Sequence, residues 1–164
     1  MMVLLQPCSE PISDKVKQLK VAPDQQDFVL PIGIIIAEQQ PTEHFQLVHH
    51  QQQLAGFFLL DTGYSQQHAF AEPSDLGLRS FFIDQQAQGR GIASAVLRQL
   101  PAYCRQQFPG FKRLVLTVNC RNQPAARLYQ KHGFADSGQL YLGGSAGPQH
   151  ILWQSLRNEH ALRH

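Results

Sequence analysis

The chain has 164 residues, of which 43% are hydrophobic and 16% are charged, and its net charge is +2. This length and apolar content are typical of one globular domain and argue against a disordered chain. The weak, dispersed charge excludes the clustered basic face of a nucleic-acid-binding protein, and no apolar run approaches the about 20 residues that cross a membrane. We therefore expect a single domain over residues 1–164 that binds neither nucleic acid nor membranes.

The cysteine content indicates a reducing compartment. Cys8, Cys104 and Cys120 are widely spaced and odd in number, which is unlike the paired cysteines of a disulfide-stabilised secreted domain. The start of the chain lacks the basic lead of a signal peptide. A cytoplasmic protein with reduced thiols is the simplest expectation.

The first half of the chain predicts short elements separated by polar turns. Ile12, Val16 and Leu19 have helical spacing, whereas Pro31 interrupts a segment that is ambiguous between helix and loop. The expected elements are, in chain order, a strand at 3–6, a helix at 12–19, the ambiguous segment at 24–37, strands at 45–49 and 53–61, and a loop at 62–75.

The second half is more regular. An apolar stripe predicts a helix that begins at Gly91, with a kink or break at Pro101, and Asn122 and Gly133 are natural start and stop signals for another helix. Together with the first half, this order of elements predicts a mixed α+β domain. The remaining expected elements are strands at 76–84, 114–118, 134–142 and 150–156, a helix at 122–132, and a loose tail from 157.

A glycine-rich turn connects the strand at 76–84 to the helix that follows it. The turn reads Gln86-Ala87-Gln88-Gly89-Arg90-Gly91. Backbone N–H groups at a helix start bind phosphates, and glycines allow a pyrophosphate to approach the backbone. A dinucleotide fingerprint requires a third glycine, and Ser94 stands at that position. By itself the turn is equally consistent with a tight connection that binds nothing.

Two blocks in this half resemble the GNAT superfamily of N-acetyltransferases. The first is Gln86-x-x-Gly89-x-Gly91, which is similar to the coenzyme A pyrophosphate loop of that family. The second is Val118-Asn119-x-x-Asn122-x-x-Ala125-x-x-Leu128-Tyr129-x-x-x-Gly133-Phe134. The resemblance covers about residues 76–156, and two blocks in the correct order are far more specific than either one.

The resemblance implies a GNAT-like fold, in which helices flank a central, twisted, mostly antiparallel sheet. It implies an acetyl-CoA-binding half at about 76–156 and an acceptor-binding half at about 1–75. Acetyl-CoA is the expected cosubstrate, and many relatives pair as homodimers. The residues expected to contact the cosubstrate are Phe82, Ile83, Gln86, Gln88, Gly89, Arg90, Gly91, Ile92, Ala93, Asn119, Asn122 and Tyr129.

The same resemblance assigns catalytic roles. Tyr129 is expected to act as the general acid that protonates the departing thiolate, although a helix tyrosine packed on the core is the alternative. A backbone N–H at Phe82 or Ile83 is expected to bind the oxyanion. Thr117 stands where some peptide-acetylating relatives place a glutamate, so a water chain is the default base. The other candidates for the base are Asp84, Glu72, Glu38, His44, His49 and His68.

The acceptor is expected to be a primary amine of a small molecule. The segment Leu19-x-Val21-Ala22-Pro23-x-Gln25-x-x-Phe28-Val29 and the strand Arg79-x-Phe81-Phe82-Ile83-Asp84 resemble bacterial diamine and polyamine acetyltransferases. The alternatives are a peptide N-terminal acetyltransferase and a non-catalytic coenzyme A-binding module. No metal-ligand spacing is present. The acidic residues available for a polyamine pocket in the first half are Glu38, Glu43, Asp61 and Glu72.

Overall fold

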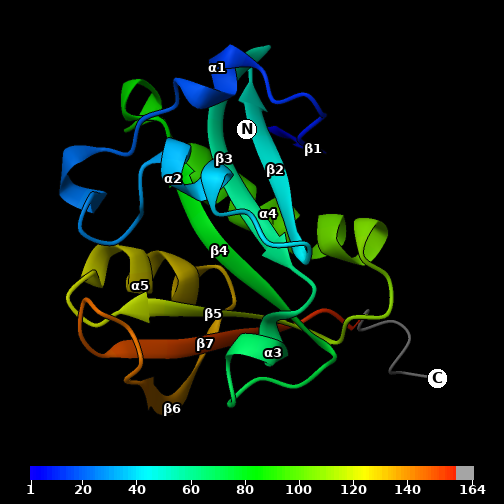
Figure 1. The fold of residues 1–164 in the computed structure, drawn as a ribbon, viewed down its shortest axis with the longest axis vertical. Helices are drawn as coiled ribbons and strands as arrows, with labels where there is room; N and C mark the ends of the chain where they lie inside the picture. The colour runs from blue at the N-terminus through cyan, green and yellow to red at the C-terminus, as the bar shows by residue number, and fades with distance from the viewer. Residues whose placement is uncertain (158–164) are drawn as a thin grey trace. The chain divides into compact units, whose positions relative to one another are not determined.

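The computed structural model describes residues 1–157 (Figure 1). Every strand expected from the sequence is present, with ends that differ by no more than two residues. The elements are β1 (Leu4–Pro7), α1 (Asp14–Lys17), η1 (Pro23–Gln25), α2 (Ile32–Ala37), β2 (Glu43–His50), β3 (Gln53–Asp61), α3 (Tyr64–Gln67), β4 (Asp75–Ile83), η2 (Gln85–Ala87), α4 (Ile92–Gln107), β5 (Arg113–Asn119), α5 (Gln123–Lys131), β6 (Ala135–Tyr141) and β7 (Gln149–Ser155).

Two local expectations differ in the structure. The ambiguous segment divides into the 3-10 turn η1 and helix α2, which begins directly after Pro31. The expected loop at 62–75 contains the short helix α3. The tail expected to be loose lies, after Arg157, outside the described residues.

Helix α4 does not break at Pro101 and continues to Gln107. Proline removes one backbone hydrogen bond and crowds the preceding turn. On either side of it, however, Leu97, Leu100 and Cys104 are completely or almost completely buried. Burial of this apolar stripe outweighs the local preference of one residue, which is how tertiary packing commonly overrides helix propensity.

The contacts divide the chain into two compact units, and neither is a continuous stretch. Unit 1 comprises Met1–Asp61 and Leu78–Val96, and unit 2 comprises Thr62–Gly77 and the chain from Leu97 onward. Strand β4 and helix α4 each have residues in both. The strand order is β1-β2-β3-β4-β5-β7-β6. The expected mixed α+β class is confirmed, as is the mostly antiparallel sheet, since β4 and β5 pair in parallel over Asp75–Gly77 and the other recorded pairs are antiparallel.

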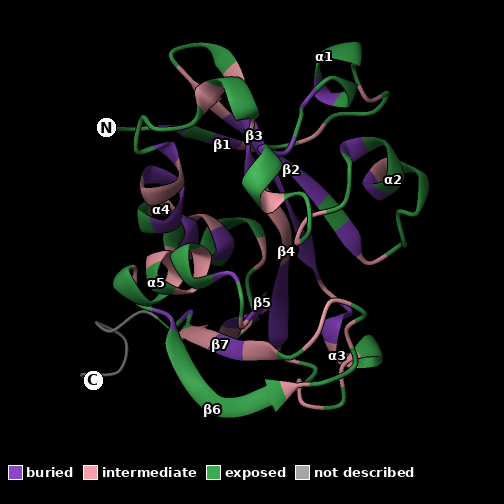
Figure 2. Ribbon diagram, turned by 90° about the vertical axis from the view of Figure 1, so that its left-hand side faces the viewer, coloured by how far each residue is buried: buried purple, intermediate pink, exposed green. Residues whose placement is uncertain are grey.

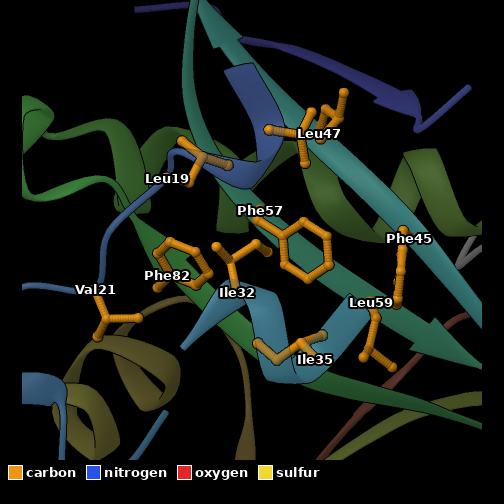
Figure 3. Packing of buried hydrophobic residues seen from close by; sticks show 10 residues of the cluster. Leu19, Val21, Ile32, Ile35, Phe45, Leu47, Phe57, Leu59 and Phe82 are labelled. Carbon is orange, nitrogen blue, oxygen red and sulfur yellow. The ribbon is translucent and has the colours of Figure 1, made fainter. Parts of the chain in front are cut away.

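Unit 1 buries an apolar cluster between its short helices and its strands. Figure 3 shows the ring of Phe57 facing Ile32, with the other cluster residues around them. Phe57 also makes edge contact with Phe45 at 5.2 Å between ring centroids. Because α1 and α2 have four and six residues, they are too short to be stable in water without such packing. This cluster therefore fixes the position of the chain around residue 20.

Unit 2 has a second, more aromatic cluster and one exposed strand. Tyr64, Val115 and Ile151 are its buried members, and α3 contributes Tyr64. Figure 2 shows β6 exposed along almost its whole length, as its burial pattern states. Helix α5 lies beside β5 in Figure 1, which places the second sequence block next to a buried strand.

We expect Gly77→Val to destabilise the fold by about 2 kcal/mol or more, although valine is the better strand residue. A Cβ added at Gly77 would overlap the Cδ1 atom of Tyr64 and lie 2.9 Å from its Cβ. Urea unfolding measures the change. Gly33→Ala in α2 is the matched control, because a Cβ there meets nothing within 4 Å. This variant is expected to be slightly more stable than the wild type, since alanine favours a helix more than glycine does. Unchanged stability of Gly77→Val would contradict this packing.

Within residues 1–157, no helix has the length and apolarity required to cross a membrane. The three cysteines are free, and Cys104 is buried. Burial raises the pKa of the Cys104 thiol to about 12, so this thiol stays protonated at neutral pH.

Candidate functional site

The connection between β4 and α4 lies in unit 1 and is held by hydrogen bonds to neighbouring strands. The Asp84 N–H donates to the carbonyl of Ala55 at 2.7 Å. After the 3-10 turn η2, the side-chain amide of Gln88 donates to the carbonyl of Ile83 at 2.8 Å. The loop therefore leaves the strand in a fixed direction and returns to begin a helix.

Gly89 and Gly91 both have left-handed backbone conformations, with φ values of 78° and 76°. A Cβ at either position would meet no atom within 4 Å, so the space around the loop is open. Helix α4 begins at Ile92, and the Ala95 N–H donates to the carbonyl of Gly91 at 3.1 Å. Glycines at positive φ before a helix N-terminus satisfy the conformational requirement of a phosphate-binding loop.

The other residues of this region that were expected to contact the cosubstrate lie at the ends of the loop or are exposed on it. Phe82, Ile83 and Ile92 are buried at its two ends, and Ala93 is half-buried. Arg90 forms no ion pair with any described residue, so its guanidinium is available to an anion. Four further loop residues, Gln86, Gln88, Gly89 and Gly91, are exposed with it.

Asp84 has a structural role rather than that of a base. One of its carboxylate oxygens accepts the Lys20 N–H at 2.8 Å, and the other accepts the Gln86 N–H at 3.2 Å. It is the N-cap of η2. Moving this carboxylate to abstract a proton would leave both backbone donors unsatisfied.

The second block lies in unit 2 and places one asparagine at the end of β5 and another directly before α5. Asn119 is buried, its amide donates to the carbonyl of Ala146 at 2.9 Å, and its oxygen accepts the Arg121 N–H at 2.9 Å. Asn119 thus connects β5 to the loop between β6 and β7. Asn122 occupies the N-cap position of α5, as expected, but its side chain makes no capping hydrogen bond.

Tyr129 is half-buried on α5, and its ring makes an edge contact with Phe134 at 5.5 Å between centroids. Within residues 1–157 its hydroxyl has no hydrogen-bond partner. Burial raises the pKa of Tyr129 above its ordinary value, so the phenol stays protonated at neutral and mildly alkaline pH. A half-buried phenol with no partner among these residues can donate to a ligand, and a proton donor to a ligand fits this arrangement.

The acidic residues of the first half are less available than the sequence suggested. The Arg79 guanidinium contacts Glu43 at 2.6 Å and Asp61 at 3.3 Å, and both carboxylates are buried. The second oxygen of Glu43 accepts the Gln40 N–H at 2.8 Å. Glu38 and Glu72 are exposed. Since Glu43 and Asp61 already bind an arginine, they do not offer an ammonium ion a free partner.

The histidine candidates have different surroundings. The Nδ1 atom of His49 lies 3.3 Å from the Gln6 amide, and burial lowers the pKa of its imidazole. His68 packs in unit 2 between the rings of Tyr64 and Phe70, at 4.3 and 5.1 Å between centroids. His44 is exposed. No group of three or more metal-ligating side chains occurs among the described residues.

One cavity of unit 1 involves residues that sequence reasoning did not select. Lys15 and Lys20 line it together with Asp84 and Gln86, at the beginning of the glycine loop. Two lysines five positions apart carry no sequence signal of a site, because isolated surface lysines are usually solvated. Only folding brings these lysines beside the loop: Lys20 and Asp84, for example, are 64 positions apart in the chain.

The comparisons with known proteins agree with the sequence blocks. The chain is 34% identical over 102 residues to the N-acetyltransferase YbbJ of Bacillus subtilis, covering 62% of this chain and 63% of that protein. It is 36% identical over 67 residues to the spermine/spermidine N(1)-acetyltransferase of the same organism, covering 41% of this chain and 43% of that protein. The chain thus matches less than two thirds of the length of either relative.

Solved structures share the fold at low sequence identity. An AAC(6')-Ib structure in complex with paromomycin and acetyl-CoA has a TM-score of 0.73 and 13% identity, and covers 94% of both chains. The spermidine N-acetyltransferase of Vibrio cholerae, in complex with CoA and spermine, has a TM-score of 0.69 and 17% identity, and covers 94% of this chain and 96% of that one. Residues 8–134, more than half of the chain, match the model of the acetyltransferase (GNAT) family, and the chain therefore belongs to this family.

Proposed function

We propose that this protein is an acetyl-CoA-dependent N-acetyltransferase that acts on a primary amine of a small molecule. The observation that carries the proposal is the open loop with positive φ at Gly89 and Gly91, which leads into α4 in a chain of this family. Backbone N–H groups and the helix dipole at this point favour a pyrophosphate. Arg90 adds a positive charge that no residue within 1–157 pairs with.

Acetyl transfer to an amine requires a neutral nucleophile, a donor to the oxyanion and a proton for the leaving thiolate. The amine nitrogen attacks the thioester carbonyl carbon, and the carbon–sulfur bond breaks as the tetrahedral centre collapses. In our proposal Tyr129 gives its proton to the departing sulfur, and a backbone N–H at Phe82 or Ile83 binds the oxyanion. Asp84 is occupied by two backbone donors, so the amine proton leaves through water, and water returns a proton to the Tyr129 phenolate.

Polyamines are the first acceptor class to test. The partial similarity to a spermine/spermidine N(1)-acetyltransferase supports this choice. The exposed carboxylates of Glu38 and Glu72 remain available to an ammonium group, whereas Glu43 and Asp61 are bound to Arg79. This limited acidic surface favours an acceptor with few positive charges, such as a diamine or spermidine over spermine.

Calorimetric titration of acetyl-CoA tests the cosubstrate site. We expect the wild-type protein to bind and a Gly89→Asp, Gly91→Asp double variant to lose at least about tenfold in affinity, because two carboxylates would repel the pyrophosphate. Gly110→Asp is the matched control, since Gly110 also has a positive φ and open space around it. Equal binding by all three proteins would refute the loop assignment.

An amine panel with acetyl-CoA then separates the functional classes. The panel contains putrescine, spermidine, spermine, an aminoglycoside and a peptide with a free N-terminus, and release of free thiol reports turnover. Turnover on a small amine supports the proposal, and turnover on the peptide alone supports a peptide N-terminal acetyltransferase. Tight binding without turnover on any amine would indicate a non-catalytic coenzyme A-binding protein.

A further inference from the structure

A second binding feature lies beside the glycine loop, within unit 1. It is a cavity of about 300 Å³ whose lining includes Lys15, Leu19, Lys20, Leu54, Asp84 and Gln86. This volume is at the lower limit of the about 300–1,000 Å³ that small-molecule sites occupy. The cavity therefore fits one end of a ligand, such as a phosphate on part of a sugar, rather than a whole cofactor.

The backbone around Lys20 is fixed to the start of the loop. Its N–H donates to the Asp84 carboxylate at 2.8 Å, and its carbonyl accepts the Gln85 N–H at 2.9 Å. Val21 and Asp84 form an isolated antiparallel bridge. The bridge and the hydrogen bond to the Asp84 carboxylate thus hold the backbone of Lys20 beside the start of the loop, independently of the flexible lysine side chain.

The charges of the cavity favour an anion. Lys15 and Lys20 form no ion pair with any residue in the described part of the chain, so both ammonium groups are available. Asp84 is the carboxylate in the lining, and both of its oxygens accept backbone N–H groups. The lining therefore has an excess of one positive charge, and a cationic amine acceptor would be repelled.

We propose that this cavity binds the 3′-phosphate of coenzyme A, through Lys15 and Lys20. The inference rests on the proposed function. Coenzyme A carries a pyrophosphate and, one ribose away, a separate phosphate on the 3′ oxygen. Gln86 lines the cavity and also begins the proposed pyrophosphate loop, so the two lysines lie next to the loop, on the side where a second phosphate of the same ligand would bind. Two ammonium groups then recognise a dianionic phosphate by charge-assisted hydrogen bonds.

Calorimetry with coenzyme A and with 3′-dephospho-coenzyme A tests the assignment. We expect the wild-type protein to prefer coenzyme A by about tenfold, since partly exposed ion pairs contribute modestly. A Lys15→Met, Lys20→Met variant is expected to bind both compounds with equal affinity, close to that of the wild type for the dephospho compound. Lys17→Met is the matched control, because Lys17 is exposed on the same helix but does not line the cavity.

The outcomes separate this inference from the proposed function. A wild-type preference that disappears only in the Lys15→Met, Lys20→Met variant supports the cavity. A preference that this variant retains, or that Lys17→Met loses equally, overturns it while leaving coenzyme A binding intact. Equal wild-type affinity for both compounds also overturns it. If the wild type binds neither compound, the proposed function fails together with the inference.

Discussion

Replacement of Tyr129 by phenylalanine is expected to lower kcat by about 10²-fold or more while acetyl-CoA binds with unchanged affinity. The variant keeps the ring that packs against Phe134 and loses only the hydroxyl. Because that hydroxyl has no partner within residues 1–157, the free energy of unfolding should stay the same or increase slightly. Loss of turnover without loss of stability would separate a catalytic role from a packing role.

The measurement is steady-state turnover with the best amine of the panel, alongside calorimetry with acetyl-CoA and a urea unfolding curve. Tyr103→Phe is the matched control, because Tyr103 lies on α4 and burial also raises the pKa of its phenol, to about 12. Its kcat is expected to remain within about twofold of the wild type. Equal kcat for Tyr129→Phe and the wild type would remove Tyr129 from the mechanism.

Replacement of Arg79 by methionine is expected to destabilise unit 1 by about 3–5 kcal/mol. The guanidinium is the cation shared by two buried carboxylates, Glu43 at 2.6 Å and Asp61 at 3.3 Å. The exposed fraction of the Arg79 side chain is 35%, whereas the side chains of Glu43 and Asp61 are 8% and 1% exposed. Removing the arginine leaves two like charges away from water and close together, which costs much more than losing a surface ion pair.

Urea unfolding of Arg79→Met measures this cost. Arg105→Met is a control on an exposed arginine of α4, for which less than about 1 kcal/mol is expected. Adding Glu43→Gln and Asp61→Asn to the Arg79→Met background should restore part of the stability, because neutral amides remove the repulsion. A cost for Arg79→Met as small as that of the control would show that the two carboxylates are well solvated without their arginine.

The sequence by itself determined where the strands lie along the chain and where the glycine loop lies. Branched and aromatic residues bounded by turn residues are a local signal, so the strand at 113–119 and the hairpin at 43–61 were found to within two residues. Gly89 and Gly91 were recognisable because few residues other than glycine adopt a positive φ readily. The two sequence blocks identified the family for the same reason, since each is contiguous in the chain.

Tertiary structure alone decided which polar side chains remain available for chemistry. Asp84 was a candidate base until the fold placed the Lys20 N–H against its carboxylate. Glu43 and Asp61 were candidate acceptor ligands until Arg79 was found between them. The physical reason is the same for these three carboxylates. What a charged group can do depends on its partners and its burial. The partners that decide here, Arg79 and Lys20, lie between 18 and 64 positions away in the chain.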